Sequence, residues 1–133
     1  MPVHSVNELV EKLAKHPEGF SGLFRRMGYV TLLPLLELPQ QVVTQSLQQS
    51  FREFGLSDAD FSSVSLRDLV AFALRAESSS GYWNGLAVRW LADGFPIDET
   101  IVRAGDEMVS AKLGTQADRH TLFRLIRRYE PCA

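Results

Sequence analysis

The side chains best suited to recognition chemistry gather near the end of this chain. A helix from the cap at Thr115 to about Tyr129 rotates by about 100° per residue, which places its basic residues opposite its apolar ones. The basic face comprises His120, Arg124, Arg127 and Arg128, with Arg119 and Phe123 beside it. Such a face suits phosphate or an acidic partner, because arginine binds both bidentately. Arginines near a helix C-terminus also complement the helix dipole, and a solvated face is the commoner explanation.

Acid–base or metal chemistry has little support in the sequence. His120 follows Asp118 in the same predicted helix, where a neutral imidazole could act as a general base. The chain contains no nucleophile elbow, no metal-binding His or Cys spacing and no phosphate-binding glycine motif. The histidines, His4, His16 and His120, are far apart, and Cys132 lies beside the C-terminus. We therefore predict no metal, no cofactor and no enzymatic activity, and expect His120 to be solvated.

An acidic group occupies residues 93–107. It comprises Asp93, Asp98, Glu99, Asp106 and Glu107, with Arg103 as the single base, so its local charge is −4 (one base minus five acids). Asp98 and Glu99 suit the N-cap and first turn of a helix. The other acids, Asp93, Asp106 and Glu107, are candidates for steering a basic partner protein.

Two further patterns indicate surfaces rather than catalysis. Tyr82 and Arg89 are spaced i, i+7 beside an inner stripe that holds Trp83 and Trp90, and an exposed Tyr–Arg pair has the composition of a binding hot spot. A tyrosine covering the edge of the core is the commoner alternative. Residues 38–51 carry no charge, which is compatible with an interface or with a surface that tolerates glutamine.

Composition sets the class of protein. The 133 residues suit one domain, predicted to span 1–133. The formal net charge is −2, from 14 basic and 16 acidic residues, which argues against non-specific nucleic-acid binding. One cysteine cannot form an internal disulfide, and the start of the chain does not resemble a signal peptide. The expected compartment is the cytoplasm, without a membrane span.

Helix start and stop signals recur along the chain and predict an all-α fold. Capping signatures begin at Ser5, Ser65 and Thr115, and further starts are expected at Pro39, Ser57 and Asp98. These signals predict six to seven helices in a compact bundle or a short array of helical hairpins. We interpret Val30–Leu38, which contains Pro34, as a buried helical turn, with a short strand as the alternative. The Ser78–Gly81 loop is too short to be a convincing domain linker.

The resulting hypothesis is a small bacterial binding protein that sequesters one partner protein. Its concrete form is an immunity protein that neutralises a toxin, because a toxin acting on nucleic acids tends to have a basic cleft that an acidic helical surface would complement. The alternative hypothesis is a nucleic-acid-binding regulator that uses the basic C-terminal helix.

Overall fold

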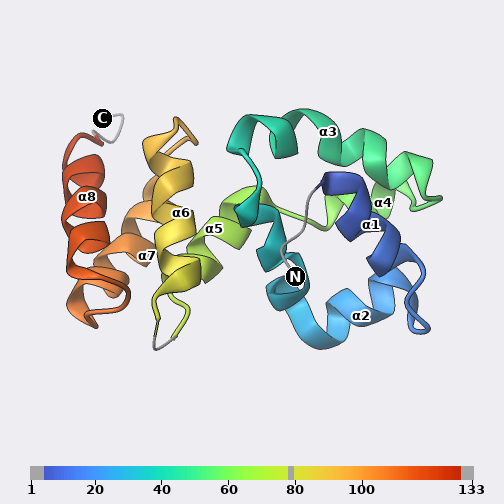
Figure 1. Cartoon of the computed structure of the whole chain (residues 1–133), viewed down its shortest axis with the longest axis horizontal. Coiled ribbons are helices and arrows are strands. Elements are labelled where there is room, and N and C mark those ends of the chain that lie inside the picture. The colour runs from blue at the N-terminus through green and yellow to red at the C-terminus, as the bar shows by residue number, and fades with distance from the viewer. Residues whose placement is uncertain (1–4, 78–79, 130–133) are drawn as a thin grey trace. The chain divides into compact units, whose positions relative to one another are not determined.

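The computed structural model describes residues 5–77 and 80–129, and the regular elements there are all helices (Figure 1). The all-α fold class is therefore confirmed. His4, Cys132 and positions 78 and 79 lie outside the described residues. The elements in chain order are α1 (Val6–Ala14), α2 (Gly19–Met27), η1 (Gly28–Glu37), α3 (Gln40–Glu53), α4 (Asp58–Ser62), α5 (Leu66–Leu74), α6 (Tyr82–Ala92), α7 (Glu99–Ser110) and α8 (Gln116–Arg127).

The chain divides into two compact units, Met1–Ser65 (unit 1) and Leu66–Ala133 (unit 2). The division falls directly before α5 and not at the Ser78–Gly81 loop, which the sequence analysis judged too short to be a convincing domain linker. That loop instead joins α5 to α6 within unit 2. A single domain over residues 1–133 stays a prediction.

In unit 1, α1 packs against α2, η1 and α3, and α3 packs against α4. Phe51 of α3 is at the centre of its aromatic core. The ring of Phe51 lies 5.1 Å from that of Phe20 and 5.7 Å from that of Phe61, both edge-on. Edge-to-face aromatic pairs are stabilising beyond the area that they bury. Unit 1 thus has its own hydrophobic core.

The segment with two competing interpretations, Val30–Leu38, is helical. Residues 30–37 belong to the 3₁₀-helix η1, which contains Pro34, and Leu38 is its C-cap, so the strand alternative is wrong. Runs of 3₁₀-helix longer than three or four residues are uncommon, and burial accounts for this one. Its buried side chains are Leu32, Leu33, Leu35 and Leu36.

Most helix starts follow the predicted caps. The side chains of Ser5, Ser57, Asp98 and Thr115 each accept a hydrogen bond from a backbone N–H in the first turn of the helix that follows. Pro39 differs by one position, because it is the N-cap of α3 rather than its first residue. These caps satisfy amides that have no partner inside the helix.

Unit 2 is built from α5 to α8. Helix α5 contacts α6 and α7, and α8 also contacts α6 and α7. Figure 1 shows α6 and α8 side by side and running in the same direction. The core between these helices is formed by fully buried side chains that include Leu69, Leu74, Ile101, Met108 and Leu122.

The inner face of α6 differs from its prediction. Trp90 is buried as expected, but Trp83 is only half-buried. The structure buries Asn84, Val88 and Leu91 instead. The buried face of α6 is therefore rotated from the one that the aromatic residues suggested. The apolar pattern missed it because one of its buried residues, Asn84, is polar.

The cap at Asp98 yields a stability prediction. Asp98→Ala removes the acceptor for the Ile101 amide, 3.0 Å away, and should lower the free energy of unfolding by about 1 kcal/mol. Urea unfolding followed by far-ultraviolet circular dichroism measures the change. Asp106→Ala, at an exposed position of the same helix, is the control and should change stability by less than about 0.5 kcal/mol. Equal effects of the two changes would show that the cap contributes nothing.

Candidate partner-binding site

A groove of about 410 Å³ runs between α6 and α8. Tyr82, the first residue of α6, lines it with 48 % of its surface exposed, and the exposed Arg89 lines it further along the helix. The other lining residues are Ser80, Gly81, Gly85, Leu86, Val88, Ala92, Thr115, Asp118 and Thr121. The two residues that the sequence suggested as a hot spot therefore share one concave surface.

Glycines allow the two walls of the groove to approach closely at one end. A Cβ atom on Gly81 would lie 2.7 Å from the Cα of Gly114, and one on Gly85 would lie 2.8 Å from Oδ2 of Asp118. The first of these contacts is with backbone, which cannot move aside as a side chain can. Residues without side chains thus allow the starts of α6 and α8 to lie this close, and the spacing of the groove depends on them.

Asn84 ties α6 to the end of α5. Its side chain is fully buried, and its Nδ2 donates to the carbonyl oxygens of Ala73, Leu74 and Ala76, each at 3.0 Å. Carbonyls at the end of a helix have no partner within it, so the amide acts as a cap supplied by the next helix. The sequence analysis missed this residue. A polar residue in the spacing of Asn84, Ala87, Val88 and Leu91 is the signal that would have revealed it.

Arg119 performs a related task in the loop that follows α7. Its Nη1 donates to the carbonyl oxygens of Lys112 (3.1 Å), Leu113 (3.1 Å) and Gly114 (2.6 Å). A positive charge there also complements the C-terminal end of the helix dipole. The sequence placed Arg119 beside the basic face of the last helix, and the structure instead commits it, half-buried, to this cap. Both hairpins of unit 2 are therefore closed by a side chain from the start of their second helix.

Ion pairs neutralise much of the predicted acidic group. The pairs are Asp98 with Arg67 (3.4 Å), Glu99 with Arg103 (3.0 Å) and Glu107 with Arg75. The carboxylate of Glu107 accepts from both Nε and Nη2 of Arg75, so this candidate for partner binding already has an internal partner. Within the described part of the chain, the exposed Asp93 and Asp106 have no ion-pair partner. The uncompensated charge of the group is smaller than the sequence suggested.

The cap of α7 is also electrostatically supported. The negative charge of Asp68, its hydrogen bond to Arg67 and the charge of Asp98 raise the pKa of Arg67 above its ordinary value. Arg67 therefore remains a cation beside the N-cap Asp98 at any physiological pH.

The basic face of α8 is arranged as predicted. His120, Arg124, Arg127 and Arg128 are all exposed. Phe123 is 48 % exposed beside them, and the guanidinium carbon of Arg127 lies 5.5 Å from the centre of its ring. Residues His120, Phe123 and Arg124 line a depression of about 300 Å³. This face is separate from the groove, as their lining residues show.

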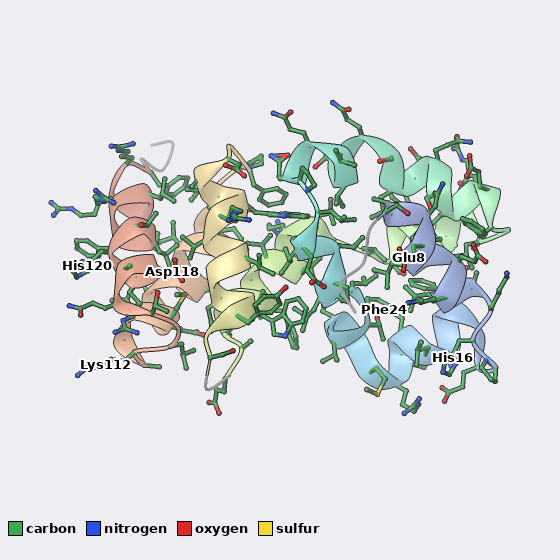
Figure 2. The ribbon with its side chains drawn as sticks, in the orientation of Figure 1. Glu8, His16, Phe24, Lys112, Asp118 and His120 are labelled. Atoms are coloured by element: carbon green, nitrogen blue, oxygen red, sulfur yellow. The ribbon has the colours of Figure 1, made fainter. Side chains whose placement is uncertain are left out.

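The structure does not bring the candidate acid–base residues together. Figure 2 shows His120 on the outer side of α8 and Asp118 on the side toward α6. Within residues 5–77 and 80–129, no group of three or more His, Cys, Asp or Glu side chains is placed to hold a metal ion. In the same ranges, no helix has both the length and the apolar character needed to cross a bilayer.

Comparison of the chain with protein-family models, with curated proteins and with solved structures gives no match.

The Asn84 cap gives a second stability prediction. Asn84→Ala leaves the buried carbonyl oxygen of Leu74 without its side-chain donor and should lower the free energy of unfolding by about 1 to 3 kcal/mol. Denaturant unfolding measures this loss. Gln116→Ala removes an exposed amide side chain from the first residue of α8 and should have an effect within about 0.5 kcal/mol. A loss at Asn84 no larger than that at Gln116 would contradict the capping role.

Proposed function

We propose that this protein binds and sequesters one partner protein, with the groove between α6 and α8 as the contact surface. The observation that supports this most is that Tyr82 and Arg89 line the same groove. Tyr82 has 48 % of its surface exposed. Tyrosine and arginine are among the residues that contribute most to protein–protein binding energy. A concave surface with both residues on it suits a protruding side chain or helix edge of a partner.

The way in which the groove is built favours tight binding. The starts of its two walls lie in close contact where Gly81 meets Gly114. The adjoining hairpins are closed by hydrogen bonds from Asn84 and Arg119. A surface that is already ordered loses less conformational entropy when a partner binds. Tyr82 adds a large contact area at a small entropic cost, because it has only two side-chain torsions.

The most specific form of the proposal is an immunity protein that neutralises a bacterial toxin in the cytoplasm. A basic cleft of such a toxin would be attracted by Asp93 and Asp106, the acids of this group that have no ion-pair partner among the described residues. Asp93 directly follows Ala92, which lines the groove. Because Glu107 is paired with Arg75, we give Glu107 a smaller role in attracting a partner than the sequence analysis did.

Charge reversal tests the electrostatic part. Asp93→Lys combined with Asp106→Lys should lower the association rate constant for the partner by about threefold to tenfold at low salt, with little change in the dissociation rate. The wild-type rate should itself fall as salt rises, because ions screen the attraction. Surface plasmon resonance measures both rates. Glu53→Lys, at an exposed glutamate of unit 1, is the control. An unchanged association rate in the double variant would refute the role of these acids.

Affinity capture tests the proposal as a whole. The tagged protein, expressed in its native cells, should retain one protein in a stoichiometric amount at both low and moderate salt. Tyr82→Ala with Arg89→Ala should abolish the retention, since truncation of a hot-spot residue commonly costs about 2 kcal/mol or more. Mass spectrometry identifies the captured protein.

The matched control for the capture is Arg25→Ala with Val30→Ala. Both residues are exposed in unit 1, and Arg25 has no carboxylate partner in the described residues. Retention that survives the Tyr82 and Arg89 changes would exclude the groove as the contact. Recovery of nucleic acid without a stoichiometric protein would contradict sequestration of a protein partner.

A further inference from the structure

The outer face of α8 combines an exposed aromatic ring with several exposed cations. Among the large hydrophobic side chains with substantial exposure, Tyr82 and Phe123 share the highest value, 48 %. Tyr82 belongs to the groove, whereas Phe123 lies in the depression that His120 and Arg124 also line. The guanidinium of Arg127 is held over the Phe123 ring at 5.5 Å, which is within the range of a cation–π interaction.

The arginines of this face lack the partners that six other arginines of the described residues have. Carboxylates bind Arg26, Arg52, Arg67, Arg75 and Arg103, and backbone carbonyls bind Arg119. Within residues 5–77 and 80–129, neither kind of partner is present for Arg124, Arg127 or Arg128. No carboxylate of the described residues neutralises their positive charge.

The helix dipole explains only part of this arrangement. Arginines in the last turn of a helix are stabilised by its C-terminal end, which accounts for the positions of Arg124 and Arg127. The dipole gives no reason for a phenylalanine to be half-exposed among them, since removing its ring from water would be favourable. An apolar ring surrounded by unpaired cations is complementary to a segment that carries both carboxylates and an apolar side chain.

We propose that the outer face of α8 docks an acidic, partly apolar segment of a protein, with carboxylates on Arg124 and Arg127 and an apolar side chain on Phe123. This surface is a second binding surface, separate from the groove between α6 and α8. Its residues are turned away from Asp118 and Thr121, the positions through which α8 lines the groove. The protein thereby has two binding faces, one on each side of α8.

Charge favours a protein segment over nucleic acid as the occupant. The whole chain has a formal net charge of −2, which repels a long polyanion, and the unpaired cations occupy one face of a 12-residue helix. Affinity for nucleic acid grows with the number of phosphates contacted. A short acidic segment needs only the few cations present, and arginine binds carboxylates with two parallel hydrogen bonds.

Fluorescence anisotropy with a defined probe tests this inference on the full-length protein. The probe is a labelled 12-residue peptide, as long as α8, in which two glutamates and one leucine repeat. A labelled single-stranded oligonucleotide of equal charge is measured for comparison. We expect the peptide to bind more tightly than the oligonucleotide. Arg124→Glu with Arg127→Glu should weaken peptide binding by about tenfold or more, and Phe123→Ala by about threefold to tenfold.

Two controls separate this face from the groove and from general charge effects. Arg25→Glu reverses an exposed, unpaired arginine of unit 1 and should leave peptide binding nearly unchanged, as should Tyr82→Ala. Circular dichroism establishes that each variant is folded. Tighter binding of the oligonucleotide, no peptide binding at low salt, or peptide binding that survives the double reversal would each overturn the proposal. None of these outcomes bears on the Tyr82 groove, which the capture experiment tests separately.

Discussion

The buried amide of Asn84 is the contact on which unit 2 depends. Its Nδ2 donates to carbonyl oxygens at the end of α5, among them the buried one of Leu74, which would otherwise have lost water without gaining a donor. The same residue lies beside Gly114, where an added Cβ would be 3.1 Å from the Cβ of Asn84. One side chain thus fixes α6 against both α5 and the start of α8. Because Tyr82 and Arg89 are on α6, this contact also fixes the groove.

Arg119 extends the same solution to the second hairpin. Asn84 and Arg119 both lie in the first turns of the second helix of a hairpin. Asn84 donates to carbonyls at the end of the first helix, and Arg119 donates to carbonyls of the loop that follows it. A neutral amide is used where the site is fully buried, and a cation is used where it is half-buried. This follows from the high cost of burying a charge without full compensation.

Pairing, rather than the count of charges, determines which surfaces remain charged. Residues 66–133 contain nine bases and nine acids, so their sum is zero. The pairs of Arg67, Arg75 and Arg103 neutralise acids, whereas Arg124 and Arg127 keep their charge. Unit 2 therefore presents a basic outer face on α8 although its net charge is zero.

Local signals in the sequence were sufficient for the helices but not for the contacts between them. The caps at Ser5, Asp98 and Thr115 were predicted because a cap and its helix are adjacent in the chain. The Asn84 cap was missed because its acceptors precede it by 8 to 11 residues, in another helix. The Arg75–Glu107 pair, 32 residues apart, was missed for the same reason.

The two surface predictions for unit 2 differ in how far the sequence carried them. Helical periodicity correctly placed His120, Arg124, Arg127 and Arg128 on an exposed face, because exposure there depends only on which side of one helix is apolar. Periodicity could also place Tyr82 and Arg89 on one stripe. It could not show a groove, because the opposite wall belongs to α8 and the spacing depends on Gly81 and Gly114.

The central claim, that a partner protein occupies the groove, is tested most directly by photo-crosslinking in the native cells. A photoreactive benzoyl-phenylalanine placed at position 82 lies in the groove, whereas the same residue at the exposed position 59 of α4 lies in unit 1. The account predicts one discrete crosslinked protein from position 82 that is absent from position 59. No discrete product from position 82, or the same products from both positions, would contradict it.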